Sequence, residues 1–278
     1  MTSMPAFLDA AARHLAGRPP VRVLYTDLDG TLLGPGGALL RAPDGQPSAR
    51  AAKALADAAA EGLTVVPVSG RQRRQLEQDA RLMGLGDAIA EAGTAVVTDG
   101  ELHYTWGACP PDLAETPHDA LRGAGALEVL LARFEGDVRL YEPWWRGREG
   151  TILLHGVLDV EAANAALAEA GVGWAEVIDN GATEGWPGRA VRAYHVLPRG
   201  VGKAQAVAED LARRGLDADA AAAIGDSPED ARMAGVVGTY FTVANGGDAA
   251  AGLLTPSAMG HGFAEAVTVL LAHAEESD

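Results

Sequence analysis

The sequence has almost no cysteine. Cys109 is the single thiol in 278 residues, which excludes an internal disulfide framework and a thiolate metal cluster and suits a reducing compartment. Long apolar runs are missing as well, and the first twenty residues contain Asp9, Arg13 and His14 where a signal peptide would be apolar. We therefore expect a cytoplasmic protein without a membrane span.

Positive charge is also scarce. The chain has 22 Lys and Arg residues against 38 Asp and Glu residues, for a formal net charge of −16. The long-range field of such a chain repels nucleic acid, so we expect no nucleic-acid partner. An anionic substrate would have to be bound by a metal ion and a few local cations. Hydrophobic residues make up 48% of the chain, enough for one large domain or two medium ones.

Strands and helices alternate in the first and last parts of the chain. Short apolar runs predict strands, and longer stretches with apolar residues three or four apart predict helices. The expected strands are 21–25, 63–68, 95–97, 221–224 and 239–243, and the expected helices are 48–61, 71–83, 203–214, 228–234 and 263–273. This alternation predicts a Rossmann-like parallel sheet covered by helices on both faces.

The middle of the chain follows a different pattern. A helix at 118–134 precedes strands at 138–141 and 151–155, and a helix at 160–170 precedes strands at 174–178 and 191–197. Two helix-strand-strand units predict an antiparallel sheet with helices on one face. The expected fold class is therefore α/β, with a core formed by residues 1–100 and 198–278 and an inserted α+β cap domain at 101–197.

Two carboxylates, Asp27 and Asp29, end the first expected strand. Residues two apart lie on the same face of an extended segment, so both would point into the crevice where open α/β sheets bind ligands. One carboxylate can then act as a nucleophile while the other exchanges a proton. A solvated turn would also contain Asp and Gly. By chance, however, Asp-x-Asp-Gly-Thr should occur in only about one chain in several hundred of this length.

Three further segments place polar groups where a strand ends or a helix begins. Ser69 and Gly70 follow one expected strand, Lys203 opens an expected helix, and Asp226 and Asp230 follow another strand. Taken alone, Ser69 is an ordinary helix N-cap, Lys203 a surface lysine and Asp226 a cap beside a helix dipole. In this order, however, the motifs resemble those of the haloacid dehalogenase superfamily of phosphatases with an aspartate nucleophile, over nearly the whole chain.

The resemblance implies a catalytic or binding role for each residue. Asp27 would attack phosphorus and form an aspartyl-phosphate. Asp29 would protonate the leaving alcohol and then deprotonate the attacking water. The phosphoryl oxygens would be held by Ser69, Gly70 and Lys203.

The resemblance also implies a Mg²⁺ cofactor. Its ligands would be the carboxylates of Asp27 and Asp226 and the backbone carbonyl of Asp29, with water completing the shell. Asp230 would lie behind these groups and orient the lysine or a metal-bound water. Members of the superfamily often have asparagine before the last aspartate, where this chain has Glu229. A contact made by such an asparagine is not expected here.

The position of the cap, between Ser69 and Lys203, resembles the type IIB cap group, which includes sucrose-phosphate and mannosyl-3-phosphoglycerate phosphatases. The leading expectation is Mg²⁺-dependent hydrolysis of a phosphorylated sugar or similar small metabolite, which would be the partner of this chain. Two alternatives stay open. One is a phosphatase of a non-sugar biosynthetic intermediate or phospho-acid, and the other is a catalytically retired protein that binds a phosphorylated ligand or a partner protein.

Substrate choice in such a protein would depend on the cap, because the core contacts only the phosphoryl group. The segment 142–150 concentrates aromatic and charged residues between two expected strands, with Trp144, Arg146 and Arg148 as candidate substrate contacts. Glu184, between the other two strands, is a further candidate. The alternative is that these tryptophans only cover the cap sheet.

Overall fold

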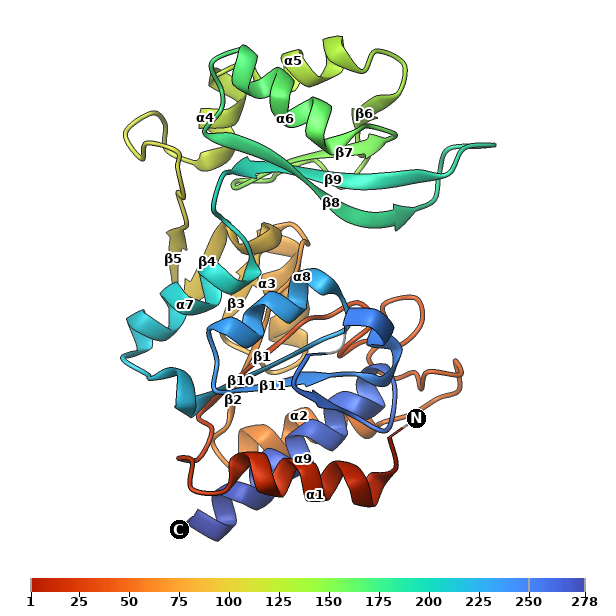
Figure 1. Ribbon diagram of the computed structural model, residues 1–278, viewed down its shortest axis with the longest axis vertical. Helices are drawn as coiled ribbons and strands as arrows, with labels where there is room; N and C mark the ends of the chain where they lie inside the picture. The colour runs from red at the N-terminus through yellow and green to blue at the C-terminus, as the bar shows by residue number, and fades with distance from the viewer. Residues whose placement is uncertain (1, 250, 278) are drawn as a thin grey trace.

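The computed structural model describes residues 2–249 and 251–277. A five-stranded parallel sheet, with the strand order β12-β11-β10-β1-β2, forms the centre of the lower half in Figure 1. Its strands are β1 (Val23–Thr26), β2 (Thr64–Pro67), β10 (Ala221–Gly225), β11 (Thr239–Thr242) and β12 (Leu253–Leu254). Thr26 lies opposite both Ile224 on β10 and Pro67 on β2. The carboxyl ends of these three strands therefore meet at one edge of the sheet.

Helices cover both faces of this sheet. They are α1 (Met4–Leu15), α2 (Arg50–Ala60), α3 (Arg73–Leu82), α7 (Lys203–Arg214), α8 (Pro228–Ala231) and α9 (Met259–Ser277). On β1, Leu24 packs with Leu55 of α2 and Phe263 of α9, whereas Tyr25 belongs to a second apolar cluster with Val207 of α7. Alternate side chains of one strand thus enter opposite layers, as a sheet covered on both faces requires. The expected fold class is confirmed.

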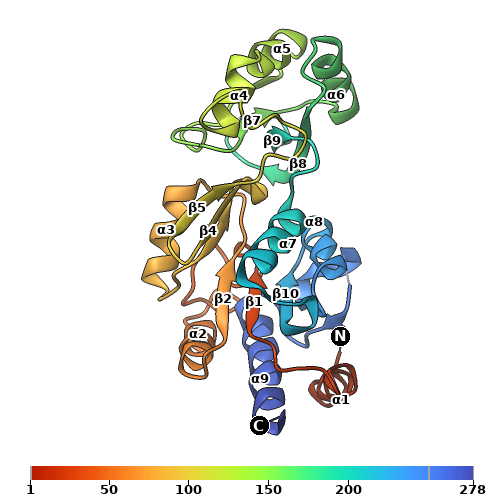
Figure 2. The same ribbon diagram turned by 90° about the vertical axis from the view of Figure 1, so that its left-hand side faces the viewer.

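A small antiparallel sheet of β3 (Ala88–Ala90), β4 (Ala95–Thr98) and β5 (Glu101–Tyr104) lies beside β2 and α3 (Figure 2). A bridge between Val68 and Ile89 connects it to the end of β2. Because β5 pairs with β4, the chain leaves this sheet only after Tyr104. We therefore propose that the inserted unit starts there rather than at residue 101.

The inserted unit is a four-stranded antiparallel sheet with the order β6-β7-β9-β8. The strands are β6 (Val138–Leu140), β7 (Ile152–Gly156), β8 (Ala175–Thr183) and β9 (Val191–Pro198). Helices α4 (Pro117–Gly123), α5 (Ala126–Arg133) and α6 (Val160–Glu169) cover the face that points away from the core (Figure 1). We call this unit the cap.

The single helix expected at 118–134 is wrong, because the structure divides it into α4 and α5. Gly125 stands between them with a φ of 77°, a left-handed conformation that ends one helix before the next begins. The cap has its own apolar cluster, in which Leu154 of β7 packs with Leu167 of α6. The next side chain on β7, Leu153, points the other way and lines a cavity shared with the core.

None of the helices within residues 2–249 and 251–277 combines the length and apolar character that a bilayer span requires.

Candidate active site

A cavity of about 610 Å³ lies between the carboxyl edge of the parallel sheet and the open face of the cap sheet. The core lines it with Asp27 and Asp29 after β1, Ser69, Gly70 and Arg71 after β2, Asp226, Ser227 and Asp230 after β10, and Gly36, Gly37, Gln75 and Lys203. The cap lines it with Tyr141, Trp144, Arg148, Leu153, Asn180 and Ala193. The sheet therefore brings together residues that are nearly two hundred positions apart in the sequence, as between Asp27 and Asp226.

Lys203 connects two of the carboxylates. It is the first residue of α7, and its Nζ donates to Asp27 Oδ1 at 2.6 Å and to Asp230 Oδ1 at 2.6 Å. Burial raises the pKa of Asp27 to about 7, with help from the negative charges of Asp230 and Asp226, while Lys203 opposes the rise. Burial alone would lower the pKa of Lys203, but its two carboxylate partners raise it overall. The ammonium therefore stays charged.

Asp27, Asp226 and Asp230 place carboxylate oxygens within 4.8 Å of one another. Asp226 accepts from Thr31 Oγ1 at 3.1 Å, and burial together with the charge of Asp230 raises its pKa. Gly30 has a φ of 93°, and a Cβ there would lie 2.5 Å from Asp226 Oδ2. Only glycine leaves room for this carboxylate. One ammonium does not neutralise three carboxylates, so an oxygen-liganded cation such as Mg²⁺ fits the donor set.

Asp230 is already occupied by contacts within the protein. Its Oδ2 accepts from Ser227 N at 3.0 Å and Ser227 Oγ at 2.6 Å in a capping box at the start of α8, and its Oδ1 accepts from Lys203. Glu229, its neighbour, pairs with Arg232 at 3.2 Å. Within the described residues, Asp226 accepts only from neutral donors, Thr31 Oγ1 at 3.1 Å and Asn245 Nδ2 at 3.3 Å, and Lys203 bonds only one oxygen of Asp27. Asp27 and Asp226 are therefore the carboxylates better placed to hold a metal ion.

Asp29 points toward the cap, and 56% of its side chain is exposed. Arg71 binds it with both prongs of the guanidinium, Nε to Oδ2 at 3.0 Å and Nη2 to Oδ1 at 2.6 Å. The third nitrogen, Nη1, donates to Asp79 Oδ2 at 2.7 Å. Sequence reasoning missed Arg71, although its place directly after Ser69 and Gly70 was a signal: it follows the same strand end.

The segment after β2 brings the core and cap into contact. Ser69 is buried, and its Oγ accepts from Arg71 N at 3.3 Å. The carbonyl of Gly70 accepts from Arg148 Nη2 at 3.0 Å, and a Cβ at Gly70 would lie 3.0 Å from His195 Nε2. Cap strand β9 therefore approaches the core closely at this glycine.

The four cap candidates divide into two pairs. Trp144 and Arg148 line the cavity, whereas Arg146 and Glu184 do not. Arg146 has 68% of its side chain exposed and pairs with Glu142 at 3.1 Å. Trp144 is 49% exposed and forms part of the cavity rim.

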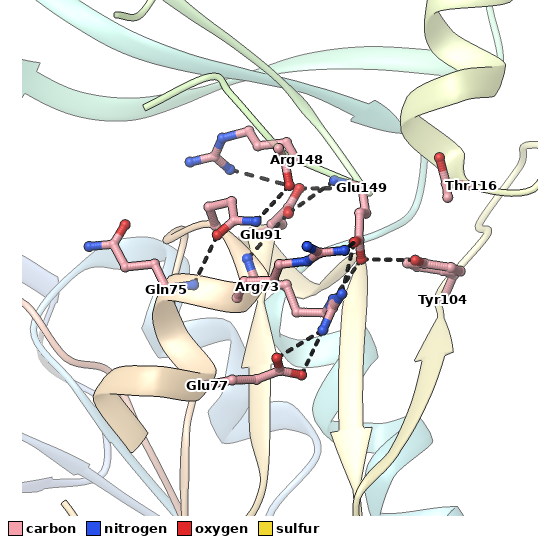
Figure 3. A network of polar contacts seen from close by, with 12 residues as sticks. Arg73, Gln75, Glu77, Glu91, Tyr104, Thr116, Arg148 and Glu149 are labelled. Atoms are coloured by element: carbon pink, nitrogen blue, oxygen red, sulfur yellow. Dashed lines mark hydrogen bonds and ion pairs between the residues drawn. The ribbon is translucent and has the colours of Figure 1, made fainter. Parts of the chain in front are cut away.

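A buried polar network holds the cap loop 142–151 against the core (Figure 3). Glu91, which follows β3 and is fully buried, accepts from the backbone N–H groups of Glu149 at 3.1 Å, Gly150 at 3.0 Å and Thr151 at 3.1 Å. Arg73 of α3 donates two hydrogen bonds to the Glu149 carboxylate, of 2.6 and 2.8 Å. Sequence reasoning missed Glu91, which stands in no motif, because its role depends on the tertiary approach of the cap.

Known proteins resemble this chain over nearly its whole length. A phosphoglycolate phosphatase from Pyrobaculum aerophilum is 30% identical over 253 residues, covering 90% of this chain and 96% of the relative. The phosphoglycolate phosphatase of Pyrobaculum neutrophilum is 29% identical over 255 residues, with 90% and 96% covered. No protein-family model matches the chain.

Solved structures share the arrangement of core and cap. A haloalkanoate-superfamily phosphatase from Bacteroides thetaiotaomicron has a TM-score of 0.62 at 18% identity, covering 90% of this chain and 95% of its own. The sucrose-phosphatase of Synechocystis, solved with sucrose and phosphate, has a TM-score of 0.60 at 15% identity, covering 91% and 98%. At such identities the likeness shows the fold alone. Together with the similarity to the Pyrobaculum phosphatases, it agrees with the fold that the sequence predicted. The chain therefore belongs to the haloacid dehalogenase superfamily, among its phosphatases.

Proposed function

We propose that this protein is a Mg²⁺-dependent phosphomonoester hydrolase that works through an aspartyl-phosphate on Asp27. The observation that carries the proposal is the contact of Lys203 with both Asp27 and Asp230 at 2.6 Å, in a carboxylate cluster that includes Asp226. A lysine ammonium beside a buried carboxylate favours the ionised form, which a nucleophile needs. The same ammonium can hold phosphoryl oxygens as charge moves onto them.

In this mechanism the Asp27 oxygen that is not bonded to Lys203 attacks phosphorus, and the bond from phosphorus to the leaving alcohol breaks. Lys203 Nζ and Ser69 Oγ bind the phosphoryl oxygens and stabilise their charge. Asp27, Asp226 and the Asp29 carbonyl would hold Mg²⁺, which would neutralise part of the negative charge of the phosphoryl group.

Asp29 then carries the proton between the two steps. It donates a proton to the departing alkoxide and later takes one from the water that attacks the aspartyl-phosphate, so it returns to its starting state. Arg71 fixes both oxygens of Asp29 through the bidentate pair. We propose that this pair orients Asp29 toward the cap cavity, where the leaving group lies.

The substrate is proposed to be a small phosphorylated metabolite, because the cap closes a cavity of about 610 Å³ over the phosphoryl site. A phosphorylated sugar is one candidate, since the partly exposed Trp144 at the rim offers an aromatic face. A phospho-acid is the other, since the Pyrobaculum relatives are named phosphoglycolate phosphatases and the buried Arg148 lines the cavity. A retired binding protein is disfavoured, because it would have had no need to keep Asp27, Asp29 and Lys203.

Hydrolysis of a generic aryl phosphate, with Mg²⁺ and after its removal by a chelator, tests this proposal. The wild-type protein should release the aryl alcohol only with the metal, and Asp27→Asn should lower the rate by at least about a hundredfold. Circular dichroism should show that the variant keeps its fold. Turnover that is equal with and without divalent metal, or that survives in a folded Asp27→Asn variant, would reject the proposal.

A further inference from the structure

Arg148 is the cavity cation with the least neutralised charge. The described residues that line the cavity include three cations, Arg71, Lys203 and Arg148. Arg71 and Lys203 each bind two carboxylates through hydrogen bonds. Arg148 has no such bond to a carboxylate within the described residues, and its ion pair with Glu91 Oε2 spans 3.9 Å. That carboxylate is also shared with the backbone N–H groups of the cap loop.

The contacts of Arg148 fix its position but use only part of its hydrogen-bonding capacity and do not neutralise its charge. Its Nε donates to the Trp144 carbonyl at 3.0 Å, Nη1 to Thr151 Oγ1 at 3.1 Å and Nη2 to the Gly70 carbonyl at 3.0 Å. A guanidinium has five N–H groups, so these contacts leave one N–H on Nη1 and one on Nη2 without a hydrogen-bond partner among the described residues. Only 3% of the side chain is exposed, and Figure 3 shows the guanidinium directed away from Glu149. This cation is preorganised at the cavity wall.

The position of Arg148 is next to the phosphoryl site. Gly70, whose carbonyl it binds, directly follows Ser69, the residue proposed to hold phosphoryl oxygens. Arg148 therefore lines the part of the cavity wall that adjoins the proposed phosphoryl site. His195 lies against the same glycine, and its buried Nε2 has no hydrogen-bond partner among the described residues. Burial, together with the charges of Arg148 and Lys203, lowers the pKa of His195 well below its usual value, so this buried ring brings no further positive charge next to Arg148.

Arg148 is the one charged side chain among the described cap residues that line the cavity. The described cap residues that line the cavity are Tyr141, Trp144, Arg148, Leu153, Asn180 and Ala193, and no carboxylate is among them. Asn180 and Tyr141 can accept as well as donate hydrogen bonds, whereas Arg148 is a pure donor with the planar fork that matches a carboxylate. Leu153 and Ala193 make the neighbouring wall apolar, which strengthens such a pair.

From this geometry we infer that Arg148 binds a carboxylate of the leaving group, so that the preferred substrates are phosphate monoesters of short hydroxy acids. The inference rests on the proposed phosphatase function and names its substrate class. In this assignment a carboxylate one or two carbons from the ester oxygen binds the Arg148 guanidinium beside Gly70. The buried guanidinium gains the full counter-ion that the protein does not provide. Binding of this end of the substrate would also position the ester for attack by Asp27.

The test compares matched substrates. Phosphoglycolate and ethyl phosphate have two carbons each and differ in the carboxylate, and a hexose phosphate provides a neutral polar leaving group. We expect wild-type kcat/KM to be at least about tenfold higher for phosphoglycolate than for ethyl phosphate. Arg148→Met should remove this preference, and Arg148→Lys, which keeps the charge without the fork, should keep part of it. Arg146→Ala is the matched control from the same loop, outside the cavity, and should keep the whole preference.

The outcomes separate the two proposals. Absence of aryl phosphate hydrolysis by the wild type would overturn the phosphatase function itself. Aryl phosphate hydrolysis without a preference for the acid, or with a preference for the hexose phosphate, would overturn only the role of Arg148. An Arg148→Met variant that loses activity equally on all substrates would show that Arg148 is structural. If that variant does not fold, Arg148→Lys and Arg146→Ala decide. A preference for phosphoglycolate that is unchanged in Arg148→Lys and lost in Arg146→Ala would contradict the assignment to Arg148.

Discussion

At the scale of single residues, the two aspartates of the first motif differ in their surroundings. Asp27 is 7% exposed and is bound by Lys203, whereas 56% of the Asp29 side chain is exposed. A buried carboxylate beside an ammonium suits a nucleophile, and an exposed one facing the cap can exchange protons with an alcohol or water. The division of labour therefore follows from the environments of the two side chains.

Asp29→Asn should lower kcat by about 10²–10⁴-fold for an alkyl phosphate, because the poor leaving group needs a proton. The loss in the first step should be much smaller for an aryl phosphate, whose alcohol leaves without help. The dissociation constant for Mg²⁺ should change little, because the variant keeps the backbone carbonyl. Single-turnover release of alcohol from both esters measures this difference. Equal losses for the two esters would remove Asp29 from the acid role.

The sequence was informative about those residues whose position follows from a strand end. Asp27, Lys203, Asp226 and Asp230 were expected to meet. Parallel strands β1 and β10 align the ends that carry Asp27 and Asp226, and the first turns of α7 and α8 supply Lys203 and Asp230. The sequence does not show which side chains of the cap loop point into the cavity and which point to solvent, so Arg146 and Arg148 were equal candidates. The structure buries Arg148 and exposes Arg146. Glu184 lies outside the cavity lining as well.

At the scale of elements, the cap loop 142–151 is tied to the core by one buried carboxylate. Glu91 Oε1 accepts from Arg73 N at 3.3 Å and Glu149 N at 3.1 Å, and Oε2 accepts from Gly150 N at 3.0 Å and Thr151 N at 3.1 Å. Both oxygens must be acceptors. The loop that includes Trp144 and Arg148 thus has a fixed position over Ser69 and Gly70.

Glu91→Gln should cost about 2–5 kcal/mol of unfolding free energy, because the amide replaces one acceptor by a donor and leaves buried N–H groups without partners. Amide hydrogens of residues 149–151 should exchange faster than in the wild type. Urea unfolding and hydrogen exchange measure the two effects. Glu77→Gln, which alters a partly exposed ion pair with the same Arg73, is the control and should cost less than about 1 kcal/mol. Equal costs for both variants would contradict the special role of Glu91.

The sequence did not predict α1, a full helix of 12 residues, and it did not predict several short strands. β3 has three residues and β5 has four, too few to show a clear period. The expected helix at 228–234 is α8 followed by a 3₁₀ turn at Arg232–Gly235. The other longer elements of the core lie where their periodicity indicated, and α7 has the expected bounds, Lys203–Arg214.

At the scale of the whole molecule, the core is assembled from segments on both sides of the insertion. β1 pairs with β10 along its full length, and Asp210 of α7 connects the layers. It is fully buried and accepts from Tyr25 Oη at 2.6 Å, Arg214 Nε at 2.6 Å and Thr98 Oγ1. Sequence periodicity predicted the sheet and the helices that cover it. Only the folded core shows that a buried acidic residue of α7 connects the helix to the sheet.

Asp210→Asn should lower the unfolding free energy by about 3–5 kcal/mol, because it leaves the largely buried Arg214 with Asp87 as its remaining carboxylate partner. Asp57→Asn removes an exposed pair with Lys53 and should cost less than about 1 kcal/mol. Urea unfolding of both variants provides the comparison. A loss below about 1 kcal/mol for Asp210→Asn would show that the layers do not depend on this network.

The central claim is that the phosphoryl group is transferred to Asp27, and the most direct measurement is to find it there. Asp29→Asn, mixed with an aryl phosphate and Mg²⁺ and quenched in acid, should retain the aspartyl-phosphate, because the water that would hydrolyse it lacks a base. Mass spectrometry of the digested protein should then show one phosphoryl group on Asp27, in an amount that matches the initial burst of aryl alcohol. A burst without a phosphoryl group on Asp27, or a phosphoryl group on a different residue, would contradict the account.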